Sequence, residues 1–212
     1  MSITIDVYPE IPELPDPQKL LDLSMQRLWA RLREYSIRVE PLIHVSLLTP
    51  FPPVMTVPPI GSEGRDHFDR IDYAWFTVGQ VPGGSDAYVC SVWDEDIECW
   101  SKMASTENRP LYYERMKRIR RYLVNGGKYV YFRCSMFQPS YIYLAFGLIA
   151  ASFAQLTNGL LVSYDGAWDT ERFPATAEEF DMWYFRPEMA ISPENKRGAE
   201  YHINNLIEML GN

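Results

Sequence analysis

The sequence has few of the residues from which proteins usually build metal sites. It contains three histidines, His44, His67 and His202, and no two of them stand four residues apart. Its three cysteines form no CxxC pair, and their odd number without a regular spacing is typical of reduced thiols. Structural zinc sites depend on closely spaced cysteine and histidine ligands. We therefore expect no metal site and no cofactor.

Motifs of catalysis are also missing. There is no GxSxG nucleophile elbow, no GxGxxG dinucleotide fingerprint and no GxxxxGK phosphate loop. The glycine pairs at 83–84 and 126–127 follow proline or asparagine, as turns do. Cys134 stands between a predicted strand and a predicted helix, where a thiolate could be stabilised, although a buried structural cysteine is the simpler interpretation. These absences favour a protein that is not an enzyme.

The N-terminal stretch MSITIDVYPEIPELPDP has neither the basic nor the apolar region of a secretory signal. No residue between Arg133 and Asp165 is charged, and 141–157 is largely apolar. That apolar part contains Ser152 and Gln155 and is shorter than the roughly 20 residues that a bilayer requires. We interpret it as a central buried helix, and we expect a cytoplasmic protein.

The chain does have the means to build a core. Of its 212 residues, 47% are hydrophobic and 14% are aromatic, which is sufficient for one large domain. Its formal net charge is −8. An acidic chain repels phosphate backbones and anionic membranes, so we expect no direct nucleic-acid or membrane partner.

Strand and helix patterns interleave irregularly, which predicts a single α+β domain over 1–212, with a mixed or antiparallel sheet packed by several helices. Alternation predicts strands at 2–8, 36–48, 71–78, 87–93, 128–134 and 160–164. Helical spacing and capping residues predict helices at 17–35, from 94 or 95, at 110–124, at 140–157, after Thr176 and after Ser192. The proline-rich stretch 49–59 predicts a long surface loop.

Two helices have a predicted core face. Asp16 is the expected N-cap of the first, and Thr176 with Glu179 predicts a capping box further on. Periodicity assigns the buried faces to Leu21, Met25, Leu28, Leu32 and Tyr35 in the first helix, and to Ala199, Ile203, Leu206, Ile207 and Leu210 in the last.

Two acidic groupings stand beside tryptophans. In WDEDIECW the carboxylates favour a solvated helix start or a partner surface, and acid/base catalysis is a weaker alternative. In SYDGAWDTE the alternative to a partner surface is a turn with Trp168 packed on the core. The predicted partner-binding residues are Trp93, Asp94, Glu95, Asp96, Glu98, Trp100, Asp165, Trp168 and Asp169.

A basic stripe on the predicted helix 110–124 contrasts with this acidity. It suggests either a nucleic-acid patch or, as the acidic chain favours, a solvated face or pairing with acidic segments of the same chain. The stripe consists of Arg115, Lys117, Arg118, Arg120 and Arg121.

Four stretches of the C-terminal half form a distinctive pattern: GKYVYFRCSMFQPS, the apolar helix, TNGLLVSYDGAWD and FPATAEEFDMWYFRPE. With this pattern the chain resembles the immunity protein 52 family of bacterial polymorphic-toxin systems. The resemblance covers about residues 1–190 and is strongest in these stretches. It implies an immunity protein, or antitoxin, that binds and neutralises a cognate toxin, such as a nuclease effector delivered by type VI secretion. The family is not enzymatic, so the resemblance implies no catalytic residue.

Two other functions remain open from the sequence. One is a small cytoplasmic enzyme that uses a carboxylate cluster or Cys134, which would need a perturbed pKa in a deep pocket. The other is an adaptor subunit of a larger assembly, which a large exposed apolar patch would favour.

Overall fold

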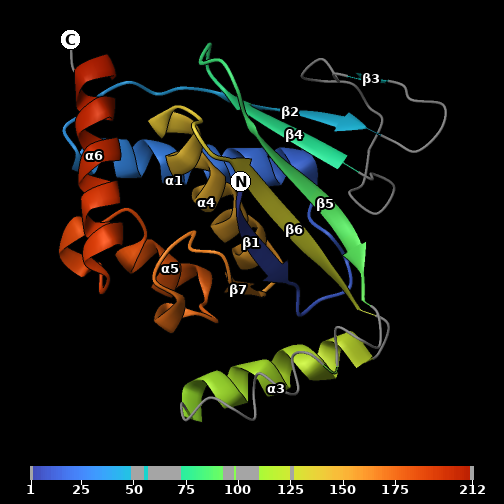
Figure 1. Cartoon of the computed structure of the whole chain (residues 1–212). Coiled ribbons are helices and arrows are strands. Elements are labelled where there is room, and N and C mark those ends of the chain that lie inside the picture. Colours follow the sequence, from blue (N-terminus) through green and yellow to red (C-terminus); the bar gives the residue numbers. More distant parts are fainter. Residues whose placement is uncertain are drawn as a thin grey trace.

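A computed structural model describes residues 2–48, 55–56, 73–92, 98, 110–124 and 127–210. Within these ranges, seven strands form one antiparallel sheet in the order β3-β2-β4-β5-β6-β1-β7 (Figure 1). This confirms the predicted α+β fold and its antiparallel sheet. The strands are β1 (Ser2–Tyr8), β2 (Ile43–Leu48), β3 (Met55–Thr56), β4 (Tyr73–Val78), β5 (Ser85–Ser91), β6 (Lys128–Ser135) and β7 (Leu160–Val162).

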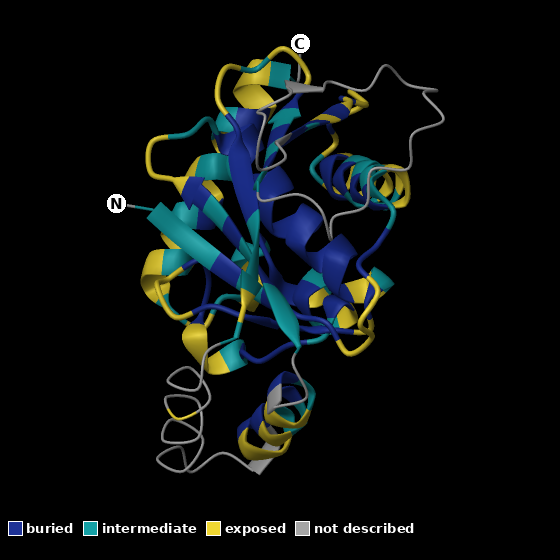
Figure 2. Cartoon of the chain, turned by 90° about the vertical axis from the view of Figure 1, so that its right-hand side faces the viewer, coloured by how far each residue is buried: buried dark blue, intermediate teal, exposed yellow. Residues whose placement is uncertain are grey.

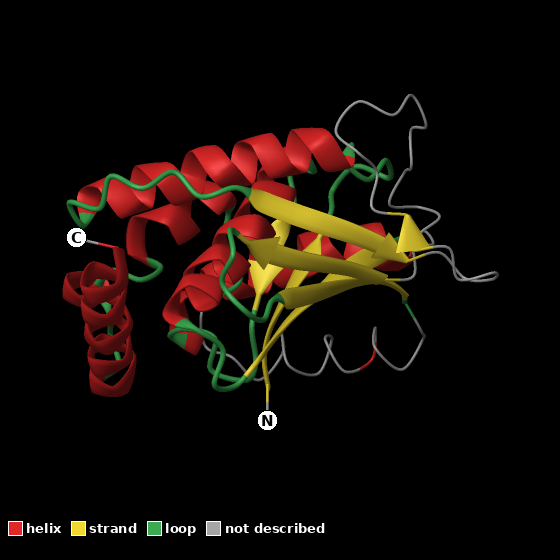
Figure 3. Ribbon diagram, turned by 90° about the horizontal axis from the view of Figure 1, so that it is seen from above, coloured by secondary structure: helices red, strands yellow, loops and turns green. Residues whose placement is uncertain are grey.

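Helices form a layer on one side of this sheet (Figure 3). The described α-helices are α1 (Pro17–Glu34), α3 (Pro110–Val124), α4 (Ser140–Leu156), α5 (Ala177–Trp183) and α6 (Pro193–Leu210). Two short 3-10 helices, η2 (Thr170–Arg172) and η3 (Pro187–Met189), lie between them in the chain. The predicted helix from 94 or 95 and most of the proline-rich stretch lie outside the described residues.

Helix α4 is the centre of the core. It packs against the sheet and against α1, α5 and α6, and its residues from Ser140 to Ala154 are buried except Tyr143 (Figure 2). The interpretation of the uncharged run as a buried helix is thus confirmed. No helix in the described part of the chain has the length and hydropathy needed to cross a membrane.

Helix α1 begins as predicted, because the Asp16 carboxylate accepts hydrogen bonds from the backbone N–H groups of Gln18 and Lys19. Its buried face, however, differs from the prediction. Arg31 is buried, and its guanidinium donates to the Asp181 carbonyl at 2.6 Å and to the Tyr184 carbonyl at the end of α5. The fully or nearly fully buried residues are therefore Leu20, Ser24, Leu28, Arg31 and Leu32, with Leu21, Met25 and Tyr35 only partly buried.

The C-terminal elements follow their capping signals. Thr176 and Glu179 form the predicted capping box at the start of α5. In α6, Ala199 and Leu206 are buried as predicted, but Ile207 is 43% exposed, so its assignment to the core face was wrong. The helix touches the core along a narrower stripe because it packs mainly against α4 and η3.

Helix α3 is attached through a second, smaller apolar cluster. Its Met116 and Ile119 pack with Tyr8 and Leu160 on the sheet. Arg115 pairs with Glu179 at 2.6 Å, and Arg118 forms a two-nitrogen ion pair with Glu10. The sequence favoured either a solvated face or pairing with acidic residues of the same chain for the basic stripe, and such pairing is confirmed for these two arginines.

Candidate functional site

The two faces of the sheet differ in what covers them. Ala74 and Phe76 on β4, and Val130 and Phe132 on β6, are buried against the helical layer. The side chains that alternate with them point to the opposite face, because successive strand residues do so. Of the described helices, only α3 packs there, at the end that carries Tyr8. Within this face we call one group of residues the open face: Thr4, Asp6, Tyr73, Trp75, Asp86, Tyr88, Tyr131, Arg133 and, at its edge, Asp165.

Four aromatic rings cross the open face from β4 to β6. The ring centroids of Tyr73 and Trp75 lie 6.4 Å apart, those of Tyr73 and Tyr88 5.1 Å, and those of Tyr88 and Tyr131 6.3 Å. Tyr88 and Tyr131 are directly opposite in the register of β5 and β6. Each aromatic cross-strand pair contributes roughly 0.2–1 kcal/mol, so the strip also stabilises the sheet.

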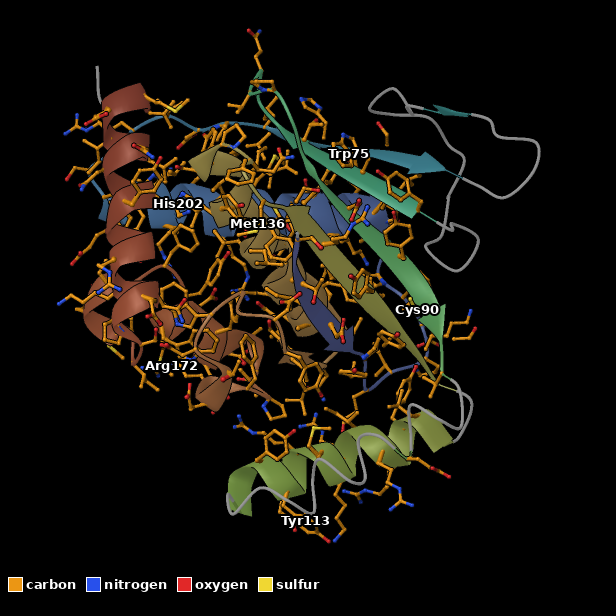
Figure 4. All side chains as sticks on the ribbon, viewed as in Figure 1. Trp75, Cys90, Tyr113, Met136, Arg172 and His202 are labelled. Atoms are coloured by element: carbon orange, nitrogen blue, oxygen red, sulfur yellow. The ribbon has the colours of Figure 1, made fainter. Side chains whose placement is uncertain are left out.

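The Trp75 ring fits into this strip because the adjacent residue, Gly84, has no side chain. A Cβ atom on Gly84, the residue immediately before β5, would lie 2.7 Å from the Trp75 ring. The indole therefore lies across the glycine (Figure 4 labels Trp75 on β4). The glycine pair that predicted a turn thus also shapes the aromatic surface.

An ion pair stands in the middle of the face. The Arg133 guanidinium donates to the two carboxylate oxygens of Asp86 at 3.0 and 2.6 Å, and its carbon lies 5.7 Å from the centroid of the Tyr88 ring. Hydrogen bonding to Asp86 raises the pKa of Arg133 above its ordinary value, despite partial desolvation. Because Asp86 is only 4% exposed, the positive charge of Arg133 is largely matched within the face.

Two further carboxylates lie beyond Tyr131. Asp6 is directly opposite Tyr131 in the register of β1 and β6. Asp165 accepts hydrogen bonds from the backbone N–H of Thr4 at 2.9 Å and from the Thr4 hydroxyl at 2.7 Å. Desolvation raises the pKa of the Tyr131 phenol, and the charges of Asp6, Asp165 and Asp86 raise it further. Among the described residues of the open face, three carboxylates therefore stand against one guanidinium.

The sequence-predicted site residues are only partly brought together. Asp165 is exposed and belongs to the open face. Trp168 and Asp169 are buried, at 3% and 1% exposure, and we remove them from the candidate partner surface because they cannot touch a partner in this conformation. Glu98 is exposed. The other predicted residues, Trp93, Asp94, Glu95, Asp96 and Trp100, lie outside the described residues.

The alternative interpretation of Trp168, as a residue packed on the core, agrees with its surroundings. Its ring stacks against Trp183 and Phe185 at centroid distances of 6.3 and 6.0 Å. Asp169 accepts hydrogen bonds from the backbone N–H groups of Ile191 and Ser192, and so fixes the entry to α6.

Sequence reasoning missed most of the open face. Tyr73, Trp75, Tyr88 and Tyr131 were assigned to strands but not to a surface. Their signal was the alternation itself: in KYVYFRC, the residues between the apolar ones are tyrosine, tyrosine and arginine. A second signal was the absence of lysine and arginine from 72 to 98, which means that Asp86 has no basic residue near it in sequence. Its partner, Arg133, comes from another strand.

The cysteine that could have supported an enzyme is placed unfavourably, while Asp94, Glu95 and Asp96 of the first carboxylate cluster lie outside the described residues. Cys134 is fully buried, and desolvation raises the pKa of its thiol to about 12, which disfavours a thiolate nucleophile. Within the described ranges, no three histidine, cysteine, aspartate or glutamate side chains are positioned to share a metal ion.

A serine and a histidine do meet, where α6 packs on α4. The Ser140 hydroxyl lies 2.9 Å from Nδ1 of His202, whose ring lies 4.8 Å from that of Tyr143. Ser140 is only 5% exposed, and Asn205 donates to the same hydroxyl at 3.4 Å, so the contact joins two helices. We interpret it as structural.

The burial of His202 predicts a pH dependence of stability. Desolvation lowers the pKa of His202 below its ordinary value of 6.5. As the pH falls below 6.5, the unfolded chain binds a proton at this position before the folded protein does, so its contribution to the free energy of unfolding decreases. We expect urea unfolding from pH 8 to 5 to show a steeper loss for the wild type than for His202→Gln. The exposed histidine variant His44→Gln is the control, and equal slopes for the wild type and His202→Gln would contradict the prediction.

The turn between β6 and α4 carries the most exposed aromatic residue of the described chain. Phe137 is 97% exposed and has φ 70°, a left-handed conformation that costs a non-glycine residue on the order of 1 kcal/mol. We expect Phe137→Gly to raise the free energy of unfolding by up to about 1 kcal/mol, because it removes this strain and loses no buried surface. Phe137→Ala keeps the strain and should change stability by less than about 0.5 kcal/mol in urea unfolding. A larger loss with alanine would show that the ring contributes to stability.

Comparison with known proteins gives no relative from which to infer a function. No protein-family model matches the chain, and neither a curated protein nor a solved structure matches it.

Proposed function

We propose that this protein is a cytoplasmic immunity protein that binds and neutralises a cognate antibacterial toxin, a nuclease effector of a type VI secretion or related system. The sequence stretch with the strongest resemblance to immunity proteins, from Lys128 to Glu188, forms β6, α4, β7 and α5. It therefore supplies the centre of the core together with the strand that carries Tyr131 and Arg133.

The observation that carries the proposal is the combination of aromatic rings and excess carboxylates on the open face. Half-exposed tyrosine and tryptophan side chains are the residues that most often dominate the binding energy of protein interfaces. Nucleases present basic surfaces to hold phosphate, so a face with three carboxylates and one guanidinium among its described residues would attract them. The net charge of −8 adds to this attraction at longer range.

Binding on this face would neutralise a nuclease by covering the surface that holds its substrate. The inhibitor needs no catalytic group for this, in keeping with the burial of Cys134. Electrostatic attraction would mainly speed association, and the aromatic strip would slow dissociation.

The test is co-expression with the product of the adjacent gene, followed by a growth assay and a pull-down. We expect the neighbour alone to stop growth, and this protein to restore growth and co-purify with it. Replacing Tyr88 and Tyr131 together by alanine should weaken rescue, whereas Tyr201→Ala, an equally drastic change at a 62% exposed tyrosine of α6, should not. A neighbour without toxicity that still forms a stable complex would favour the adaptor function, and no toxicity and no complex would refute the proposal.

A further inference from the structure

The open face already holds one guanidinium group, and its surroundings show what the face can bind. Arg133 lies over the ring of Tyr88 and forms two hydrogen bonds with the Asp86 carboxylate. An aromatic ring below and a carboxylate beside a planar cation are the two contacts that favour arginine over lysine. The centre of the face is therefore occupied by a side chain of the protein itself.

An aromatic ring and a carboxylate also lie close together one strand further along the sheet. Tyr131 follows Tyr88 in the aromatic strip, at 6.3 Å between ring centroids. Asp6 stands directly opposite Tyr131 in the strand register, and Asp165 is held at the edge of the same face by two hydrogen bonds from Thr4. No ion pair of Asp165 with another described residue is present in the structure.

We propose that the end of the open face formed by Asp6, Tyr131 and Asp165 binds an arginine side chain of a basic partner segment. The inference rests on the proposed function, because the segment is taken to belong to the toxin. The guanidinium would lie over the Tyr131 ring as that of Arg133 lies over Tyr88, with Asp165 as its carboxylate partner. Asp165 oxygens that accept from Thr4 keep lone pairs for such a contact.

Charge decides between a basic polypeptide and a nucleic acid as the occupant. Open sheets with aromatic rings also stack the bases of single strands, but those surfaces combine the rings with cations for the phosphates. Here the one arginine among the described residues of the face is paired with Asp86, and Asp6 and Asp165 would repel a phosphate backbone. Charge complementarity therefore favours an arginine-bearing segment.

The test is titration of the full chain with short peptides, followed by calorimetry at low salt. A peptide of alternating glycine and arginine should bind, and its lysine counterpart should bind about fivefold more weakly because it lacks the planar stacking group.

The double variant Asp6→Asn, Asp165→Asn should weaken arginine-peptide binding about tenfold. Tyr131→Phe keeps the ring and should bind normally, while Tyr131→Leu should bind about fivefold more weakly. Glu200→Gln, which removes an exposed carboxylate of α6, is the matched control and should change nothing.

Three results would overturn the inference: no binding of the arginine peptide, equal binding by the double asparagine variant, or tighter binding of a single-stranded oligothymidine than of the peptide. The growth assay separates this inference from the proposed function. If the double asparagine variant neutralises the toxin as well as the wild type, the arginine site is refuted and the immunity function stands. If the peptide results hold but no neighbouring toxin is neutralised, the function is refuted and the site stands.

Discussion

Replacing Asp169 by alanine is expected to lower the free energy of unfolding by about 3–5 kcal/mol. The carboxylate is 1% exposed and accepts hydrogen bonds from the N–H groups of Ile191 at 2.7 Å and Ser192 at 2.8 Å, and from the Asn195 side chain at 2.9 Å. Arg172 lies 3.7 Å from it and shares its charge. The variant would leave these donors and this guanidinium without their acceptor, at the junction that starts α6.

Thermal and urea unfolding of the purified variant measure this loss. The control is Asp165→Ala, four residues earlier, where the carboxylate is exposed and accepts mainly from Thr4. It should cost about 1–2 kcal/mol, because each of the two exposed hydrogen bonds contributes about 0.5–1 kcal/mol net. Equal costs for the two variants would mean that Asp169 is not the anchor of α6. Partner binding should show the reverse order, with Asp165 the more important residue and Asp169 important only through folding.

Local rules predicted the elements of this fold well, because their causes are local. The Asp16 cap, the capping box of Thr176 and Glu179, and the strand 128–134 each depend on residues close in sequence, and the structure confirms all three. The uncharged run after Arg133 predicted a buried helix because apolar residues occur on every side of such a helix, so that no side of it is suited to solvent.

What the sequence could not reveal depends on distant residues. Arg31 is buried because two carbonyl oxygens at the end of α5, about 150 residues later, accept hydrogen bonds from its guanidinium. The buried face of α1 therefore includes Arg31, which the hydrophobic periodicity did not predict. Trp168 and Asp169 looked like a surface pair because tryptophan and aspartate next to a turn often are. Only the packing of Trp183 and the entry to α6 explain their burial.

The candidate site was hidden for a related reason. A tyrosine in an alternating strand fits either face of a sheet, and only the position of the helical layer decides which face is open. The sequence correctly placed Asp165 on the surface because this residue lies in a turn, and charged side chains in turns are usually exposed to solvent. Tyr131 and Tyr88 were missed because their alternation resembles that of any half-buried strand.

The close approach of α4 and Tyr184 in the core predicts the second large effect. Gly147 lies in the middle of α4, and a Cβ atom there would lie 2.3 Å from the Tyr184 ring. Tyr184 cannot move aside, because it is fully buried and its hydroxyl donates to the Tyr143 carbonyl at 2.7 Å. We therefore expect Gly147→Ala to lower the free energy of unfolding by about 3 kcal/mol, even though alanine is the better helix former by about 1 kcal/mol.

The same substitution in α6 is the matched control. Gly198 also lies within a helix, but nothing surrounds the position that its Cβ atom would take. Gly198→Ala should therefore raise stability by about 0.5–1 kcal/mol, through helix propensity and a less flexible unfolded chain. Urea unfolding of both variants measures these two changes, which have opposite signs and should differ by about 3.5–4 kcal/mol. If Gly147→Ala instead stabilised the protein, Tyr184 would have room to move, and the contact between α4 and the segment after α5 would be looser than the structure shows.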